Sequence, residues 1–87
     1  MSVRIETVEA ALLEFVSKDI LLRKALIEPN DDIFDAGFDS LSLSRVLVFV
    51  EERFGVIVPE EDVDIGQIAT VASMARFFHD YIAKTKA

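Results

Sequence analysis

Apolar residues recur at three- and four-residue spacings along residues 40–54. On a helical projection they fall in one stripe less than about 110° wide, and the polar residues of the segment lie off it. The stripe consists of Leu43, Val46, Leu47, Val50 and Phe54. This spacing predicts an amphipathic α-helix that buries the stripe in a core. Asp39 is suited to cap its start and Gly55 to close its end, so we expect the helix to begin at Ser40.

Two further segments show helical periodicity. One runs from about Val3 to Ser17 and the other begins near Thr70, and we expect both to form amphipathic helices. The apolar face of the second contains Val71, Met74, Phe77, Phe78, Tyr81 and Ile82. Between them, the acids of residues 60–65 follow a proline and favour a short helix before Gly66 interrupts it. The predicted fold is therefore all-α, a bundle of three longer helices and one short third helix.

The connection from Asp19 to Asp39 is long for a domain of this size. It contains too many apolar residues for a loop that extends into solvent, namely Leu21, Leu22, Leu26, Ile33, Phe34 and Phe38. We therefore expect it to lie across the bundle, with a helical turn near residues 21–26. No repeat, low-complexity tract or linker divides the chain, so residues 1–87 are expected to form a single domain.

The 87 residues have a formal net charge of −7. Residues 31–64 contain ten acids against Arg45 and Arg53, a net charge of −8. This acidic field argues against nucleic-acid binding and favours partners with basic patches. The same charge also fits a face that only keeps the protein soluble. Since the sequence has no cysteine, disulfides, thiolate metal sites and a cysteine nucleophile are excluded.

Catalysis and membrane insertion find no support in the sequence. No pair of titratable groups presents itself as acid and base, and His79 is interpreted as a flank residue of the last helix, so we expect no enzymatic activity. The acids of residues 60–64 lack the spacing of a calcium loop, and no metal site is predicted. No apolar run spans a bilayer and no secretory signal is evident, so we expect a monomeric, cytoplasmic protein.

The most informative stretch is Gly37-Phe38-Asp39-Ser40-Leu41, which leads directly into the apolar helix. It resembles the acyl and peptidyl carrier proteins, whose mark is a Gly-x-Asp-Ser-Leu run at the start of the second of four helices. The long preceding loop and the later run Val58-Pro59-Glu60-Glu61 agree with this resemblance, which covers nearly the whole chain. It implies a four-helix bundle of acyl-carrier type, with a long first loop and a short third helix.

Ser40 is the predicted attachment site. A serine in the first turn of a helix lies where free N–H groups and the positive end of the dipole favour a phosphate. The resemblance implies that a phosphopantetheinyl transferase joins 4′-phosphopantetheine from coenzyme A to the Ser40 hydroxyl through a phosphodiester. The thiol of this arm would carry cargo as a thioester from a loading enzyme to downstream synthase or tailoring enzymes.

Asp39 is expected to cap the helix and to present Ser40 to the transferase, and the resemblance suggests that it helps to hold Mg²⁺. An ordinary capped helix start, without any attached group, is the plain alternative for this pair.

Leu41 and Val48 project about 140° to 160° from the core stripe, beside Arg45 and Glu52, and we expect both aliphatic side chains to be exposed. Exposed aliphatic residues on the helix that carries the arm suggest a docking surface. The resemblance implies that the positions matching Leu41 and Val48 meet partner enzymes. Scattered surface hydrophobes without function are the alternative.

The chain departs from the fatty-acid type of carrier. Ser42 and Arg45 occupy positions that are usually acidic there, and residues 59–71 run slightly longer. The sequence therefore looks more like carriers of polyketide, nonribosomal-peptide or related specialised pathways, with a carrier of fatty-acid synthesis as the alternative. A small acidic helical adaptor without a prosthetic group is the alternative of another class.

The aromatic residues Phe77, Phe78 and Tyr81 are interpreted as core rather than as a ligand slot. The resemblance nevertheless suggests a hypothesis about cargo, in which an acyl chain enters between the helices.

Overall fold

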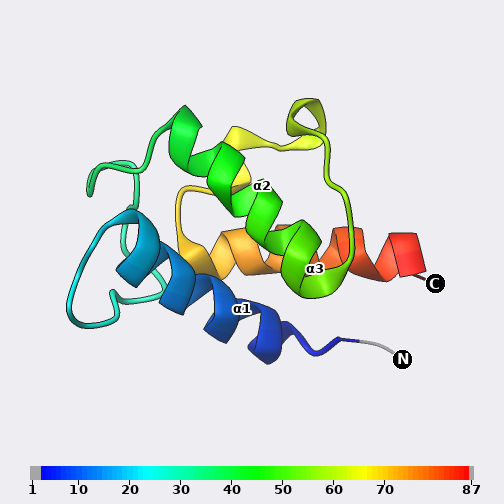
Figure 1. Ribbon diagram of the computed structural model, residues 1–87, viewed down its shortest axis with the longest axis horizontal. Coiled ribbons are helices and arrows are strands. Elements are labelled where there is room, and N and C mark those ends of the chain that lie inside the picture. Colours follow the sequence, from blue (N-terminus) through cyan, green and yellow to red (C-terminus); the bar gives the residue numbers. More distant parts are fainter. Residues whose placement is uncertain (1–2, 87) are drawn as a thin grey trace.

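In the computed structural model, which describes residues 3–86, three α-helices are joined by irregular connections and short helical turns (Figure 1). The helices are α1 (Ile5–Glu14), α2 (Ser40–Phe54) and α3 (Val71–Lys86). Residues 3–86 contain no strand, so the predicted all-α class is confirmed. Residues 1, 2 and 87, at the ends of the expected domain, lie outside the described residues.

The first helix differs from its predicted bounds at both ends. α1 begins at Ile5 rather than Val3, and the chain then continues as a π-helical segment, η1 (Phe15–Ile20). Phe15, the first residue of η1, stacks on Phe49 of α2 with the ring centroids 4.3 Å apart. These contacts with a distant helix explain the extension, because the periodicity of a single segment does not include them.

The start and the end of α2 agree with the prediction. The helix begins at Ser40, and Gly55 closes it in the left-handed conformation with φ of 71°. α3 begins one residue after the predicted position.

Two 3₁₀ turns, η2 (Glu60–Asp62) and η3 (Ile65–Gln67), stand where the sequence predicts one short helix. The chain becomes extended at Val63, and the Asp64 carboxylate accepts a hydrogen bond from the Gly66 N–H at 3.0 Å. This cap starts a second turn instead of continuing the first.

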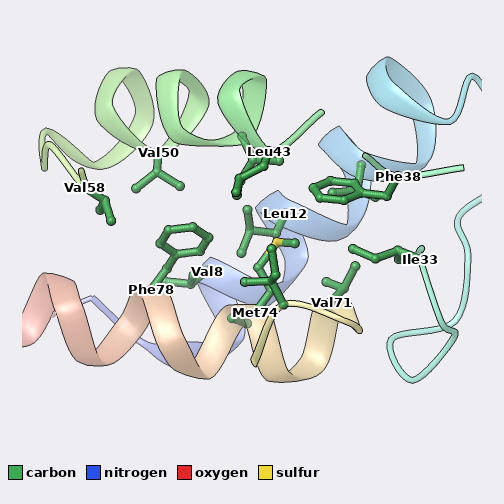
Figure 2. Packing of buried hydrophobic residues seen from close by; sticks show 14 of the residues in the cluster. Val8, Leu12, Ile33, Phe38, Leu43, Val50, Val58, Val71, Met74 and Phe78 are labelled. Carbon is green, nitrogen blue, oxygen red and sulfur yellow. The ribbon is translucent and has the colours of Figure 1, made fainter. Parts of the chain in front are cut away.

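The core lies between α2 and α3, and α1 completes it (Figure 2). Figure 2 shows Leu43 and Val50 of α2 pointing toward α3, with Leu12 of α1 between the two helices. Of the predicted stripe, three residues are buried, and Leu47 and Phe54 are half-buried at its edge. The core of α3 contains Val71, Met74, Ala75, Phe78 and Ile82, and Phe77 and Tyr81 pack against it. The interpretation of the aromatic residues as core is therefore confirmed for Phe78, whereas Phe77 and Tyr81 are half-buried at the edge of the core.

The first connection, residues 21–39, is fixed to the helices at several points. Ile33 and Phe38 are buried, and the Ile33 N–H donates to the Ala69 carbonyl at 2.9 Å. The Ala72 N–H donates to the Pro29 carbonyl at the same distance of 2.9 Å. This part of the connection therefore lies across the bundle, as the sequence predicts.

The expectation of a helical turn near residues 21–26 is wrong. Leu22 adopts the left-handed conformation with φ of 55°, which reverses the chain as it leaves η1. Leu22 and Leu26 are 79% and 52% exposed and do not join the core, whereas Leu21 packs against it.

The second connection, residues 55–70, packs through Val56, Val58 and Ile68, which are buried. The Tyr81 hydroxyl of α3 donates to the Asp62 carboxylate of η2 at 3.2 Å. Desolvation and this carboxylate raise the pKa of Tyr81 above its ordinary value. Within residues 3–86 no helix combines the length and the apolar character that crossing a membrane requires.

Candidate functional site

Asp39 forms the cap of α2. Its carboxylate accepts hydrogen bonds from the Ser42 N–H at 2.9 Å and from the Ser42 hydroxyl at 3.0 Å. Both bonds favour the charged carboxylate, and the bond from the Ser42 N–H has the larger effect. The pKa of Asp39 therefore lies below its ordinary value. Gly37, with φ of 111°, turns the chain into this cap in a conformation that favours glycine. Sequence reasoning noted Ser42 only as a departure from the fatty-acid type and missed its bond to Asp39.

Ser40 lies in the first turn of α2 and is exposed. Its carbonyl oxygen accepts a hydrogen bond from the Ser44 hydroxyl at 3.3 Å, and its own hydroxyl has no hydrogen-bond partner among residues 3–86. The first turn of a helix also leaves backbone N–H groups without intrahelical acceptors. The Asp39 carboxylate holds the Ser42 N–H and also interacts with the Leu41 N–H, which leaves the Ser40 N–H for a phosphate. The residues at this helix start therefore fit a phosphate-linked group.

The outer face of α2 is partly aliphatic. Leu41 and Val48 are 71% and 56% exposed, so their predicted exposure is confirmed. Arg45 and Glu52 are exposed beside them. These four residues thus share one surface, which begins one residue after Ser40.

Arg45 also has an intramolecular role that the sequence does not reveal. Its guanidinium donates to the Asp19 carbonyl at 3.0 Å and lies 5.9 Å from the centroid of the Phe15 ring. The last carbonyls of a helical segment lack intrahelical donors and carry partial negative charge. Arg45 therefore fastens α2 to the end of η1 and remains exposed on the predicted docking surface.

Two hollows open on this side of the molecule. The smaller, of about 370 Å³, is lined by Phe15, Ser44, Arg45, Val48, Phe49 and Glu52. The larger, of about 790 Å³, lies along α1 and shares Phe15 and Phe49 with the first. Neither is lined by a residue of α3. The hypothesis that an acyl chain enters between the helices therefore stays a prediction.

His79 makes a structural contact in the described part of the chain. The His79 Nε2 lies 2.8 Å from the Val3 carbonyl oxygen and ties the segment before α1 to the flank of α3. Residues 3–86 contain no group of three or more His, Cys, Asp or Glu side chains placed to hold a metal ion.

Comparison with known proteins agrees with this geometry. Residues 10–78 match the family described as "Phosphopantetheine attachment site". The chain is 29% identical over 84 residues to an acyl carrier protein of Syntrophobacter fumaroxidans, covering 95% of this chain and 96% of that one. It is 34% identical over 59 residues to acyl carrier proteins of Myxococcus xanthus and Micrococcus luteus, covering 67% of this chain and 75% and 73% of theirs. No solved structure gives a significant match.

The matched range includes the whole of α2 and both connections. Its relatives are carriers, and the group that such carriers hold covalently is 4′-phosphopantetheine, which supplies a flexible chain ending in a thiol. This finding overturns the alternative of an adaptor without a prosthetic group. The chain therefore belongs to the phosphopantetheine-binding family of the acyl carrier proteins.

Proposed function

We propose that Ser40 bears the phosphopantetheine arm and that the protein holds acyl or aminoacyl intermediates on it as thioesters. The observation that carries this proposal is the exposed Ser40 hydroxyl, free of hydrogen bonds within residues 3–86, at the first turn of α2. The Ser40 N–H in that turn would donate a hydrogen bond to a phosphate oxygen. Since the sequence has no cysteine, the thiol of the arm would be the only one in the protein.

Asp39 presents Ser40 to the transferase by fixing the start of the helix. Its carboxylate is held by the Ser42 N–H and hydroxyl, which leaves the neighbouring hydroxyl of Ser40 pointing into solvent without a competing acceptor. A carboxylate with a lowered pKa stays charged near neutral pH, so it is also suited to help hold Mg²⁺ with ligands from the transferase.

The chain catalyses no step itself. Tethering turns the delivery of an intermediate into a local search within each partner's active site, so the carrier acts through effective concentration. Leu41, Arg45, Val48 and Glu52 form the surface that loading and downstream enzymes contact. Their shared exposure on the face of α2 next to Ser40 supports this role.

Within the carriers, we favour a specialised biosynthetic pathway over fatty-acid synthesis. Ser42 is buried and bonded to Asp39, and Arg45 is positive, so two positions of α2 lack the negative charge usual for the fatty-acid type. Partners of the fatty-acid type would therefore meet an altered charge pattern on this helix. A monomeric carrier in the cytoplasm is the form of the protein that we expect.

Intact-protein mass spectrometry tests the attachment site. The protein is incubated with coenzyme A, Mg²⁺ and a broad-specificity phosphopantetheinyl transferase, beside Ser40→Ala and the matched control Ser44→Ala. We expect the wild type and Ser44→Ala to gain one phosphopantetheine and Ser40→Ala to gain none. A gain by Ser40→Ala would place the arm elsewhere, and no gain by a folded wild type with several transferases would exclude Ser40.

Cargo is tested on the loaded protein. Incubation with enzymes that load malonyl, fatty acyl or aminoacyl groups, followed by mass spectrometry, is expected to show efficient loading by enzymes of specialised pathways. Preferential loading by enzymes of fatty-acid synthesis would instead favour that pathway.

A further inference from the structure

The smaller of the two hollows, which we call the outer hollow, lies where α2 meets η1. Phe15 of η1 and Phe49 of α2 stack across this junction, and Val48 completes the apolar part of the lining. Val48 is 56% exposed and the two rings are half-buried. The volume of about 370 Å³ falls toward the lower end of the roughly 300–1,000 Å³ typical of small-molecule sites. The outer hollow therefore offers apolar surface to a small ligand.

Two polar residues that line the outer hollow are held by hydrogen bonds. The Arg45 guanidinium donates to the Asp19 carbonyl at 3.0 Å, and the Ser44 hydroxyl donates to the Ser40 carbonyl at 3.3 Å. The stacked rings fix the apolar side of the hollow, with centroids 4.3 Å apart. A site fixed in this way needs little ordering when a ligand enters, which lowers the free-energy cost of binding.

The outer hollow begins one helical turn beyond Ser40. Ser44 and Val48 follow Ser40 at steps of four residues, so they lie on the same side of α2 with a drift of about 40° at each step. Glu52 is the lining residue of α2 farthest from Ser40. At 1.5 Å per residue, Ser44 and Glu52 stand about 6 Å and 18 Å beyond Ser40 along the helix axis. The hollow thus extends along α2 away from the attachment site.

The length of the arm matches this position. The phosphopantetheine chain has about 13 bonds between phosphorus and sulfur, and since three bonds of an extended chain span about 3.3–3.6 Å, it reaches roughly 15 Å. That distance falls between Ser44 and Glu52 along α2, so the acyl group at the end of the arm would enter the hollow. A short flexible tether holds its cargo at roughly millimolar effective concentration. Even a weak site at this position would therefore be occupied.

The lining indicates which class of cargo fits. Arg45 and Glu52 carry opposite charges, so the outer hollow has no net charge that attracts an ionised acyl group. The larger hollow shares Phe15 and Phe49 with it, but five of its ten lining residues are charged. A long aliphatic chain that passed the two rings would meet those charged groups, whose desolvation is unfavourable. A short apolar chain would contact only Val48 and the rings.

We propose that the outer hollow is a resting site for short apolar acyl groups carried on the Ser40 arm. The inference rests on the proposed role of Ser40 and places the cargo on the outside of α2, against η1, rather than between α2 and α3. Arg45, Val48 and Glu52 line this hollow and also belong to the proposed docking surface. A cargo at rest therefore covers the surface that partner enzymes contact, and a partner that docks there displaces it.

Nuclear magnetic resonance of the loaded protein tests where the cargo lies. The protein is modified with Mg²⁺, a broad-specificity transferase and either hexanoyl- or acetyl-coenzyme A, and mass spectrometry verifies each product. The hexanoyl group is isotope-labelled, so that filtered NOE spectra show which protons of the protein it contacts. Val48→Asn removes apolar surface from the hollow. Ile57→Asn is the matched control at an exposed aliphatic residue outside it.

We expect NOE contacts from the hexanoyl methyl group to the Phe15 and Phe49 rings and to Val48, with chemical-shift changes there that are smaller in the acetyl form. Val48→Asn should lose most of these contacts and Ile57→Asn should keep them, both with unchanged thermal unfolding. Contacts with Val50 and Met74 would overturn the proposal in favour of a chain inside the bundle. A hexanoyl group without contacts to the protein would overturn it in favour of a solvated cargo. Failure of the Ser40 assignment is seen separately, as a wild-type protein that gains no mass.

Discussion

Two helical segments of this protein are followed by a residue in the left-handed conformation, but the two residues differ. Gly55, with φ of 71°, caps α2, whereas η1 is capped by the right-handed Leu21, and Leu22 follows with φ of 55°. At both ends a backbone N–H returns to the last turn at 2.8 Å, from Gly55 to Glu51 and from Arg23 to Ser17. Glycine adopts this conformation without a Cβ clash, whereas a leucine pays about 1–2 kcal/mol for it. The second connection thus begins without steric strain, whereas the first contains a strained, exposed leucine next to its start.

The difference teaches that the two connections satisfy different requirements. The second connection exposes Ile57 and Ile65 as well, but it packs through buried valines and begins with Gly55, which adopts its left-handed conformation without strain. The first connection also has buried residues, Ile33 and Phe38, in the part that precedes α2. It nevertheless exposes Leu22 just after η1. The difference between the two connections is thus the backbone strain at Leu22, which the hydrogen bonds of the neighbouring segment to Ser17 hold in place.

The largest effect is expected from the anchor of the first connection. Ile33→Ala removes a side chain with no exposed surface and should lower the free energy of unfolding by about 2–5 kcal/mol. The matched change in the second connection, Val58→Ala, removes fewer buried atoms and should cost roughly half as much. Urea unfolding followed by circular dichroism measures both. A smaller loss for Ile33→Ala than for Val58→Ala would mean that the first connection is the more weakly anchored of the two.

Ser17→Ala should have the next largest effect, because the Ile27 N–H loses its acceptor in a partly buried position. We expect a loss of about 1–3 kcal/mol in the free energy of unfolding. Hydrogen exchange should become faster at the Ile27 amide, and little changed at residues 56–58 of the second connection. Ser44→Ala, at an exposed serine, is the control for loss of a hydroxyl. An Ile27 amide that exchanges as in the wild type would show that Ser17 does not fix the start of the first connection.

Substitutions at the two left-handed positions, Leu22 and Gly55, measure the strain at each. Leu22→Gly relieves the left-handed strain but adds entropy to the unfolded chain, so we expect a net stabilisation of about 0.5 kcal/mol. Gly55→Ala introduces the same strain and should destabilise by about 1 kcal/mol. Thermal unfolding of both variants beside the wild type shows whether each substitution raises or lowers the melting temperature. If Leu22→Gly lowers the melting temperature, the Leu22 side chain contributes a stabilising contact despite its exposure.

The smallest effect is expected from the pH dependence of the cap at the end of the first connection. Because the folded-state pKa of Asp39 lies below its ordinary value, Asp39 stabilises the fold above about pH 4. This contribution is lost as the pH falls through the folded-state pKa. Asp39→Asn keeps a capping oxygen and removes the titration, so its melting temperature should fall less than that of the wild type below pH 4. Parallel acid unfolding curves for the two proteins would contradict the assignment.

Local patterns were enough to predict α2 and its surroundings. The spacing of Leu43, Val46 and Val50, the cap at Asp39 and the glycine at position 55 are each read from residues about one turn apart or less, and the structure agrees with all of them. The exposure of Leu41 and Val48 follows from the same projection. The motif that contains Ser40 led to the family for the same reason, since its residues are adjacent in sequence.

Features that depend on distant segments could not be predicted. The π-helical turns of η1 place Phe15 against Phe49 and Arg45, which lie 34 and 30 residues further along the chain. Leucine at position 22 gives no signal for a left-handed conformation, since the conformation is imposed by the bonds to Ser17. Likewise, the intramolecular roles of Ser42 and Arg45 depend on atoms that only the fold brings together.

The contact between Tyr81 and Asp62 has a practical consequence. The chain contains one tyrosine and no tryptophan, so its intrinsic ultraviolet fluorescence comes from a single phenol on α3. That phenol donates a hydrogen bond to η2, and a carboxylate partner alters phenol emission. Unlabelled protein therefore contains an optical reporter of the second connection. Emission that shifts as the arm is loaded with progressively longer acyl groups would reveal movement of η2 away from α3.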